Sequence, residues 1–362
     1  MKSRPKVVSI VGARPQFVKL APLSRALTGQ CRHVIVHTGQ HYDDNMSQLF
    51  FRQLRLPRPQ VNLGLSGGRH GAMTGRMLSA IEKLFSTDRP DFVIVYGDTN
   101  STLAGALAAA KLSIPVGHVE AGMRSFVNDM PEEINRRLTD HLAQVLFCPT
   151  DTSMKNLRAE GIKQNLVHSG DLMYELLHDS RSVIRAHKQT LRRFNLTADR
   201  YLLITAHRAA NVDTVENLKR LVEVFRSVDL PTLFPVHPRT RMQLKRNRLW
   251  PTLHKLENLI LCEPLGYLDT LTAAMHARAV LTDSGGLQKE ALFLGTQVLT
   301  MREETEWVET LGRGNRLVGL DAKRIRRALD NPQKVGRIPY LIKRRRPSHI
   351  IAATVNRFLT GR

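Results

Sequence analysis

The chain has 362 residues, 42% of them apolar, and its 54 Lys and Arg against 32 Asp and Glu give a net charge of +22. This length exceeds one typical hydrophobic core and predicts two domains. The positive charge favours anionic partners such as nucleic acid, anionic lipid or phosphorylated metabolites. Because the sequence holds no nucleic-acid recognition module, we expect no nucleic-acid partner.

The N-terminus, the apolar runs and the cysteines exclude further classes of protein. The first apolar run, Lys6–Val11, predicts a short strand, so we expect no signal peptide here, and no run approaches the roughly 20 residues of a membrane span. Cys31, Cys148 and Cys262 are far apart and form no Cys-x-x-Cys pair, which argues against a disulfide framework or a zinc site. We expect a soluble, cytoplasmic protein with buried thiols.

Short apolar runs typical of β-strands alternate with helical stretches along most of the chain. The first series of expected strands is Val7–Val11, Val34–His37, Phe92–Tyr96, Pro115–Val119 and Val145–Cys148, with helices over Phe17–Leu27 and Ser101–Lys111. The second series is Leu202–Thr205, Thr232–Val236, Leu259–Leu261, Val280–Thr282 and Gln297–Thr300. This alternation predicts an α/β fold of two doubly wound, Rossmann-like domains, each a parallel sheet covered by helices on both faces.

A charged helical stretch, Tyr174–Arg200, separates the two series and is expected to connect them. We predict an N-terminal domain over residues 1–172, a C-terminal domain over residues 173–340 and a basic C-terminal helix over residues 341–362 that packs back on the N-terminal domain. Sheets of this kind bind ligands beyond the carboxyl ends of their strands, so we expect the domains to face each other across a cleft. The basic tail is compatible with a solvated helix flank or with an anion-binding patch.

Three carboxylates follow predicted strands of the first domain. Asp98 comes directly after a strand, Glu120 lies in a glycine-flanked turn, and Glu132 follows Pro131 at a predicted helix start. Asp98 could instead cap a helix, and Glu132 could pair with Arg136 at i,i+4 spacing. Because the carboxyl ends of parallel strands share one sheet edge, we expect the three to crowd there. Crowded carboxylates hold a proton more tightly, which suits a general acid near neutrality.

Two stretches predict sites for phosphate. The first expected strand ends in GARPQFVK, Gly12–Lys19, where free backbone N–H groups, Arg14 and Lys19 could hold phosphate oxygens. In the second domain, Ser284, Gly285 and Gly286 lead from a strand into a helix whose start suits a diphosphate. Glu290 follows one and a half turns later, where a carboxylate can bind both ribose hydroxyls. The spelling is neither the dinucleotide pattern nor a Walker loop, so we expect no cofactor.

Two histidines, His207 and His237, follow neighbouring strands of the second domain. Each could bind phosphate or donate a proton, or could merely form a hydrogen bond within its loop. No spacing links them to carboxylates in the pattern of a metal site, so we predict no metal.

Seven motifs, taken in order, resemble the non-hydrolysing UDP-N-acetylglucosamine 2-epimerases. The motifs are Gly12–Lys19, His37–His41, Tyr96–Thr102, His118–Gly122, Pro131–Arg136, Pro235–Arg239 and Thr282–Gly286. The resemblance runs from about Val7 to Gly319. It implies the two-domain fold that many glycosyltransferases also use, the GT-B fold, with UDP held mainly by the second domain. It also implies a homodimer and a role in making precursors of surface polysaccharides.

The resemblance implies a reaction and roles for the residues. The C2 proton of the sugar is removed, UDP leaves C1, and UDP then re-adds while the proton returns to the opposite face of C2. The implied acid–base and catalytic group is Asp98, Glu120, Glu132 and His207. The implied substrate-binding residues are Arg14, Lys19, Arg136, His237, Ser284, Gly285, Gly286 and Glu290. A second, activating site for UDP-N-acetylglucosamine is implied at Gln40 and His41.

Three departures from the family's usual spelling concern the substrate. The family usually shows an acidic residue where this chain has Ala210, an arginine where it has Trp307, and a Tyr-Gly-x-Gly-x-Ala segment where it has Tyr340 before a basic run. The Thr-Glu-Trp-Val-Glu spelling around Trp307 is similar to a branch that epimerises UDP-2,3-diacetamido-2,3-dideoxyglucuronate. That branch is one alternative. A hydrolysing epimerase, a GT-B glycosyltransferase and a non-catalytic basic protein are the others.

Overall fold

The computed structural model describes residues 4–40, 51, 53–336 and 346–361. The chain divides into two compact units: unit 1 comprises Met1–Leu176 and Tyr340–Arg362, and unit 2 comprises Leu177–Pro339. The boundary that we expected at residues 172 and 173 falls in the first turn of α7 (Leu172–Ala186), because a helix rather than a loop leads out of unit 1.

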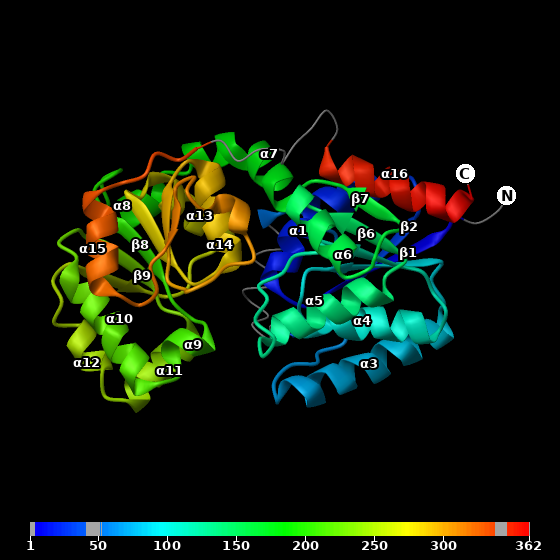
Figure 1. The fold of residues 1–362 in the computed structure, drawn as a ribbon, viewed down its shortest axis with the longest axis horizontal. Helices are drawn as coiled ribbons and strands as arrows, with labels where there is room; N and C mark the ends of the chain where they lie inside the picture. Colours follow the sequence, from blue (N-terminus) through cyan, green and yellow to red (C-terminus); the bar gives the residue numbers. More distant parts are fainter. Residues whose placement is uncertain (1–3, 41–50, 52, 337–345, 362) are drawn as a thin grey trace. The chain divides into compact units, whose positions relative to one another are not determined.

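Unit 1 is built on a seven-stranded sheet, order β3-β2-β1-β4-β5-β6-β7, in which the described pairings are parallel. The strands are β1 (Lys6–Val11), β2 (Arg32–His37), β3 (Val61–Asn62), β4 (Phe92–Tyr96), β5 (Val116–Val119), β6 (Val145–Cys148) and β7 (Leu166–His168). The helices are α1 (Arg14–Leu27), α3 (His70–Thr87), α4 (Asn100–Lys111), α5 (Pro131–Leu142), α6 (Asp151–Ala159) and α16 (Pro347–Thr360). Figure 1 shows α3, α4 and α5 on one face of the sheet and α16 on the other.

Local sequence explains the central elements of unit 1. Strand β4 reads Phe-Val-Ile-Val-Tyr and is buried throughout, which is typical of a strand covered on both faces. Helix α4 begins after Thr99, whose hydroxyl oxygen accepts a hydrogen bond from the backbone N–H of Thr102. Helix α5 begins at Pro131, as the sequence predicted.

Unit 2 is built on a six-stranded parallel sheet, order β10-β9-β8-β11-β12-β13. The strands are β8 (Leu202–Thr205), β9 (Thr232–Pro235), β10 (Leu259–Cys262), β11 (Ala279–Thr282), β12 (Gln297–Thr300) and β13 (Asn315–Leu317). The helices are α8 (Gln189–Arg193), α9 (Ala209–Val212), α10 (Val215–Ser227), α11 (Pro238–Arg246), α12 (Trp250–Leu253), α13 (Tyr267–His276), α14 (Gly285–Leu294), α15 (Ala322–Asp330) and the 3-10 helix η1 (Val308–Thr310). Figure 1 shows α10 and α15 on one face of this sheet and α13 and α14 on the other. The predicted α/β class is confirmed.

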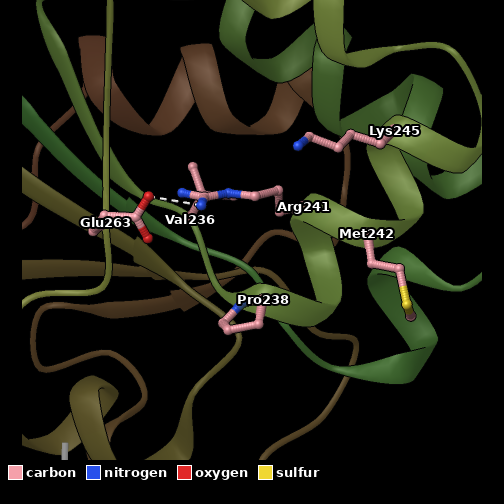
Figure 2. Close-up of a pocket in the computed structure, with 6 residues that line it drawn as sticks. All are labelled: Val236, Pro238, Arg241, Met242, Lys245 and Glu263. Atoms are coloured by element: carbon pink, nitrogen blue, oxygen red, sulfur yellow. Dashed lines mark ion pairs between the residues drawn. The ribbon is translucent and has the colours of Figure 1, made fainter. Parts of the chain in front are cut away.

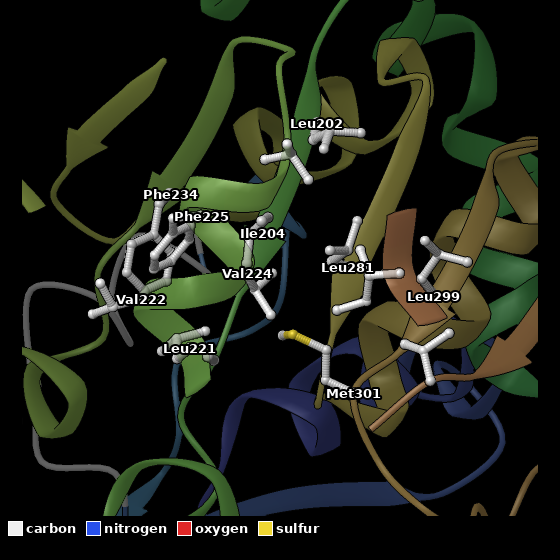
Figure 3. Close-up of a cluster of buried hydrophobic side chains, with 14 of the residues drawn as sticks. Leu202, Ile204, Leu221, Val222, Val224, Phe225, Phe234, Leu281, Leu299 and Met301 are labelled. Carbon is white, nitrogen blue, oxygen red and sulfur yellow. The ribbon is translucent and has the colours of Figure 1, made fainter. Parts of the chain in front are cut away.

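The core of unit 2 fills the space between its sheet and α10. Figure 3 shows Leu281 and Leu299 from neighbouring strands and Leu221 from α10 in one cluster. Phe225 of α10 and Phe234 of β9 meet with ring centroids 4.8 Å apart. Burying one such side chain stabilises a fold by about 1.5–3 kcal/mol, so this cluster holds the sheet edge rigid for the loops that leave it.

Helix α16 returns the end of the chain to unit 1, where it packs against α1. Phe358 of α16 meets Phe92 of β4 with ring centroids 5.3 Å apart. The Glu175 carboxylate accepts hydrogen bonds from the backbone N–H and the hydroxyl of Ser348, at 2.8 and 2.6 Å, and so fixes the helix start. The helix that we expected over residues 341–362 spans Pro347–Thr360, and residues 341–345 lie outside the described residues.

The three cysteines are free thiols, but only one of them is buried as we expected. Cys148 is buried, whereas Cys31, directly before β2, and Cys262, the last residue of β10, are half-buried. Burial raises the pKa of Cys148 to about 12 and the pKa values of Cys31 and Cys262 to about 11. All three thiols therefore stay protonated near neutrality. Within the described residues, no helix combines the length and apolar character needed to cross a bilayer.

Each sheet has one point at which the strand order reverses, and ligands of doubly wound sheets bind there, beyond the carboxyl ends of the strands. In unit 1 the reversal lies between β1 and β4, and in unit 2 it lies between β8 and β11. We call the loops that begin at Gly12, Gly97 and Glu120 the unit 1 edge. The loops that begin at Ala206, Val236 and Asp283 form the unit 2 edge.

Candidate active site

The loop after β1 is closed by a side chain rather than left open for an anion. The Gln16 side-chain oxygen accepts hydrogen bonds from the backbone N–H groups of Gly12 and Ala13, at 2.7 and 3.0 Å. The prediction of free N–H groups at this turn is therefore wrong, because a glutamine three residues into α1 caps them. Arg14, half-buried at the first position of α1, still places a guanidinium at this edge.

Lys19 pairs with Glu120 by an ion pair in which both side chains are largely buried. We expected Lys19 at a phosphate, and the structure instead makes it the partner of a predicted catalytic carboxylate. Glu120 itself has φ of +71°, a left-handed backbone that non-glycine residues adopt rarely. The turn after β5 thus holds this carboxylate toward α1.

Asp98 pairs with Arg136 of α5, and Arg136 also bonds Glu133 with its Nη1 at 2.7 Å from Glu133 Oε2. The pairing that i,i+4 spacing allowed between Glu132 and Arg136 is replaced by these two partners. Glu133 is buried and also accepts hydrogen bonds from the backbone N–H and hydroxyl of Ser125. The sequence prediction passed over Glu133, although it stands beside Glu132 in the same motif.

Glu132 is the exception among the three predicted carboxylates. It lies half-buried at the second position of α5, and its carboxylate has no hydrogen bond or ion pair with any residue that the structure describes. The predicted convergence is supported by geometry: a side chain added at Gly97 would come within 3.3 Å of the Glu120 carboxylate, and Arg136 joins Asp98 to the next turn of α5. The unit 1 edge therefore carries two charge-compensated carboxylates and one uncompensated carboxylate.

Gln40 lies within unit 1 beside the start of α4. Its side-chain oxygen accepts hydrogen bonds from the backbone N–H and the hydroxyl of Ser101, at 3.0 and 2.7 Å. These bonds fix the loop after β2 to α4. His41, its neighbour in the predicted activating site, lies outside the described residues.

At the unit 2 edge, Asp283 organises the loop that carries His207. Asp283 Oδ1 lies 3.1 Å from His207 Nδ1, and Oδ2 accepts hydrogen bonds from the backbone N–H groups of His207 and Arg208, both at 2.8 Å. Burial opposes the ionisation of Asp283, but the His207 ring and the N–H donors outweigh it and lower its pKa to about 2. Asp283 therefore stays ionised and orients the His207 imidazole. The sequence prediction omitted Asp283, although it begins the motif that supplies Ser284.

His237 lies close to His207, with ring centroids 5.2 Å apart. Its Nδ1 accepts a hydrogen bond from the backbone N–H of Arg239 at 3.2 Å, which caps α11. This is the hydrogen bond within its own loop that the sequence analysis allowed for His237. His237 also lies next to His207 at the same edge, so the two predicted histidines do converge.

Helix α14 begins at the unit 2 edge with the three predicted diphosphate residues. Ser284 is its N-cap, and Gly285 and Gly286 form the start of the first turn. A side chain at Gly285 would come within 2.4 Å of Glu306 Oε1, so glycine is required for this approach. Glu306 is itself bonded to Arg302 at 2.9 Å. The helix start thus faces a carboxylate, as expected of a site with positive character.

Tyr267 is a second residue at this edge that the sequence prediction missed. Its hydroxyl donates a hydrogen bond to Glu290 Oε1 at 2.9 Å, and both side chains are buried. Glu290 is the residue predicted to bind ribose. No sequence pattern links a tyrosine at the start of α13 to a glutamate on α14, so only the packing of the two helices reveals the contact.

A surface pocket of about 370 Å³ lies beside His237 at the carboxyl ends of β9 and β10. Figure 2 shows its basic wall, formed by Arg241 and Lys245 of α11, and the ion pair of Arg241 with Glu263 at 2.6 Å. Arg241 Cζ and Lys245 Nζ lie 5.6 and 5.7 Å from the centroid of the Trp250 ring. The pocket contains none of the predicted site residues, so it adds a basic surface to this edge and does not replace the site.

Among the residues that the structure describes, no group of three or more His, Cys, Asp or Glu side chains is placed to hold a metal ion. The two histidines of the unit 2 edge use their contacts for Asp283 and for the start of α11.

Comparison with known proteins places the chain among nucleotide-sugar enzymes. A sequence profile described as UDP-N-acetylglucosamine 2-epimerase matches residues 25–341. A Methanococcus maripaludis protein named UDP-N-acetylglucosamine 2-epimerase homolog is 48% identical over 88% of this chain and 90% of its own. A Pseudomonas aeruginosa protein named UDP-2,3-diacetamido-2,3-dideoxy-D-glucuronate 2-epimerase is 46% identical over 87% of this chain and 88% of its own.

Solved structures agree with the sequence comparison. The crystal structure of Methanocaldococcus jannaschii UDP-GlcNAc 2-epimerase in complex with UDP-GlcNAc and UDP is 40% identical, has a TM-score of 0.88 and covers 99% of this chain and 100% of that one. A UDP-glucosyltransferase from Polygonum tinctorium has a TM-score of 0.61 over 99% of both chains at 14% identity, which shows a shared fold and nothing more. The predicted GT-B type of fold is confirmed.

Proposed function

We propose a function from one premise: the chain belongs to the UDP-N-acetylglucosamine 2-epimerase family. The proposed reaction interconverts UDP-N-acetylglucosamine and UDP-N-acetylmannosamine without net hydrolysis. The observation that carries it is the set of carboxylates at the unit 1 edge. Asp98 and Glu120 are each paired with a cation, whereas Glu132 is not. Epimerisation needs such a set, because one group must remove the C2 proton and another must return it to the opposite face.

The first half of the reaction is an elimination. A carboxylate takes the C2 proton, the C2–H electron pair forms the C1–C2 double bond, and the C1–O bond breaks with its electrons leaving on UDP. A bound 2-acetamidoglycal and UDP result. The second half reverses these steps: a UDP oxygen adds to C1 and a carboxyl group delivers a proton to the other face of C2. No atom is gained or lost, and no redox partner is required.

The unit 2 edge supplies what the departing UDP needs. The first turn of α14, Ser284 to Gly286, offers backbone N–H groups and the positive end of a helix dipole to the diphosphate. His207, oriented by ionised Asp283, can give a proton or a hydrogen bond to a phosphate oxygen. Glu290, held by Tyr267, is placed to bind the ribose hydroxyls.

A deuterium experiment tests this function. The protein is incubated with UDP-N-acetylglucosamine in deuterated water, and the products are followed by NMR. We expect UDP-N-acetylmannosamine to form with deuterium at C2. Equal amounts of free UDP and free sugar would instead identify a hydrolysing enzyme. If UDP-N-acetylglucosamine takes up no deuterium at C2, the proposed reaction is wrong.

A second substrate is favoured by one observation, the replacement of the family's usual arginine by Trp307. This tryptophan is buried, and Lys289 Nζ lies 3.3 Å from its ring centroid. The Pseudomonas aeruginosa relative, whose name gives a diacetamido-glucuronate substrate, is 46% identical to this chain. The same deuterium experiment with UDP-2,3-diacetamido-2,3-dideoxyglucuronate decides between the two sugars by the ratio of their kcat/KM values.

The proposal also includes two further points: the chain forms a homodimer, and its product is a precursor of surface polysaccharide. It rests on family resemblance alone. Sedimentation equilibrium tests the assembly directly, since a chain of 40.9 kDa would give a particle of twice that mass. A mass equal to one chain at micromolar concentration would contradict it.

A further inference from the structure

A buried cluster of four charged side chains lies behind the unit 1 edge and touches none of the residues expected to bind substrate. We call it the His118 cluster; its members are His118, Asp140, Arg124 and Glu160. The side chains of His118, Asp140 and Arg124 are fully buried, and that of Glu160 is 20% exposed. Charges buried so deeply are costly unless each has a partner, so their retention calls for a physical explanation.

The bonds within the His118 cluster fix the number of ring protons on His118. Its Nε2 lies 2.7 Å from the carbonyl oxygen of Gly97, which can only accept, so Nε2 carries a proton. Its Nδ1 lies 2.7 Å from Asp140 Oδ1. The other oxygen of Asp140 already accepts from the backbone N–H of Gly122 and from Arg124, at 3.1 and 2.7 Å. One proton must lie between Nδ1 and Oδ1, since neither atom could otherwise donate to the other. Because Arg124 and the Gly122 N–H favour the ionised form of Asp140, we place this proton on Nδ1.

The charges of the cluster then balance. Protonated His118 and Arg124 face ionised Asp140 and Glu160, with Arg124 binding Glu160 through Nε and Nη2 at 2.7 and 2.6 Å. Burial opposes the ionisation of Asp140, but His118 and Arg124 outweigh it and lower its pKa. The cluster is neutral as a whole and fully hydrogen-bonded, which is the condition under which buried charges are stable.

The cluster bonds the backbone beside two of the proposed acid–base residues. Gly97, whose carbonyl oxygen His118 holds, directly precedes Asp98. Gly122, whose N–H Asp140 holds, follows Glu120 by two residues. Gly97, Glu120 and Gly122 all have φ between +63° and +77°. Glycine adopts this left-handed conformation readily, whereas it is strained for Glu120, whose turn therefore depends on the contacts that surround it.

We propose that His118 is a positioning residue: as a doubly protonated ring fixed by Asp140, it holds the turns that carry Asp98 and Glu120 in their reactive positions. The inference rests on the proposed function for its kinetic consequence, but not for its structural content. It assigns no proton transfer to His118, whose side chain is fully buried. Its bond to a main-chain carbonyl sets the position of the Asp98 backbone.

Two substitutions separate the two bonds of the ring. Gln at position 118 places its amide nitrogen near the former Nε2 and keeps a donor for the Gly97 carbonyl. Asn places its amide nitrogen near the former Nδ1 and keeps only the bond to Asp140. We expect His118→Asn to lower kcat at least tenfold and His118→Gln to lower it no more than threefold, with KM within twofold of wild type in both. His349→Gln, an exposed histidine on α16, is the control and should match wild type.

A role in folding alone gives a different pattern. The two variants would then lose kcat to the same extent, in proportion to their loss of thermal stability. That result, or wild-type kcat in His118→Asn, overturns the proposal. Nitrogen NMR of protein labelled at histidine adds a direct readout: one buried ring with protons on both nitrogens should be present in wild type and missing in His118→Gln. A neutral His118 ring would also overturn it.

The two proposals can fail separately. If the wild-type protein exchanges no C2 proton on either nucleotide sugar, the proposed function is wrong. The backbone amide signals of Asp98 and Glu120 then still test the positioning role. We expect them to move in His118→Asn and to stay near their wild-type positions in His118→Gln. Unmoved signals in both variants would overturn the role of His118 whatever the reaction is.

Discussion

The two sheet edges have the same topology and opposite chemistry. At the unit 1 edge, Asp98 and Glu120 follow β4 and β5, Glu132 lies in the first turn of α5, and cations from α1 and α5 compensate Glu120 and Asp98. At the unit 2 edge, the reversal between β8 and β11 brings together a helix start with two glycines and a histidine held by a buried carboxylate. We propose that the unit 1 edge moves protons and that the unit 2 edge holds the anion.

The comparison shows that the fold supplies the place and the loop residues supply the role. Gln16 closes the N–H groups at the start of α1, so that helix offers little to a phosphate. By contrast, α14 begins after its N-cap Ser284 with Gly285 and Gly286, which have no side chains to cover the backbone of the first turn. Substitutions at the unit 1 edge should therefore change kcat, and those at the unit 2 edge should change nucleotide affinity.

The largest effect is expected at the unit 1 edge. Asp98→Asn, Glu120→Gln and Glu132→Gln should each lower kcat at least about a hundredfold, because each removes a group that can move or stabilise a proton. The dissociation constant for UDP, measured by calorimetry, should stay within about threefold of wild type. The exposed substitution Glu82→Gln on α3 serves as the control for loss of one carboxylate.

The three variants should differ in stability, which sharpens the comparison within the unit 1 edge. Glu120→Gln removes the carboxylate that pairs with Lys19, and Asp98→Asn removes one of the two carboxylates that pair with Arg136. Glu132→Gln removes no ion pair with any residue that the structure describes. Urea unfolding should therefore rank Glu132→Gln as the most stable of the three. Near-normal turnover in all three would show that the acid–base assignment is wrong.

The next effect tests the buried carboxylate of the unit 2 edge through stability. The folded pKa of Asp283, about 2, lies below its ordinary value of 3.8, so its stabilisation is present above pH 4 and is lost as pH falls toward 2. At pH 7 the free energy of unfolding of Asp283→Asn should be about 2 kcal/mol lower than that of wild type. Urea titrations should show this gap closing between pH 4 and 2.

A gap that stayed constant with pH would show that the Asp283 charge is not the source of the stability. The exposed substitution Asp229→Asn is the control at pH 7, where we expect its unfolding free energy to lie within about 0.5 kcal/mol of wild type. Because Asp283 also orients His207, the Asp283→Asn variant should lose turnover as well.

The sequence predicts the strands well and the contacts of the site less well. Buried parallel strands such as β4 have continuous apolar runs, whereas β3, β7 and β13 are short and lie at or near sheet edges, where no such run is needed. Residues after strands were identified because topology brings them to one edge. Partners from distant elements, such as Lys19 for Glu120, could not be, since no local spacing encodes a contact across 101 residues.

Missed residues follow the same rule. Asp283 stood inside a recognised motif, and its burial was the missing information. Tyr267 and the His118 cluster depend on which helices pack together, and α13 and α5 show no pattern that reveals it. Sequence alone therefore locates the edges but not the groups that orient the residues on them.

A smaller effect is expected from a methyl group at the start of α14. Gly285→Ala would bring Cβ within 2.4 Å of Glu306 Oε1, so the Glu306 side chain or the first turn of α14 must shift where we propose that the diphosphate binds. We expect KM for the nucleotide sugar to rise about tenfold, equivalent to about 1.4 kcal/mol, with kcat less affected. Gly75→Ala, in an exposed and open part of α3, is the matched control and should leave KM unchanged while slightly raising stability.

The smallest effect concerns the hydroxyl of Tyr267. Tyr267→Phe removes one hydrogen bond of 2.9 Å to Glu290 and leaves the aromatic ring in place, so packing is conserved. A single hydrogen bond to a charged group contributes about 1–2 kcal/mol, part of which the freed carboxylate recovers from water or ligand. We expect UDP to bind about fivefold more weakly, because Glu290 is proposed to contact the ribose. The affinity for inorganic pyrophosphate, which has no ribose, should not change. Equal weakening for both ligands would place Glu290 at the diphosphate instead, and an unchanged affinity for UDP would remove it from the nucleotide site.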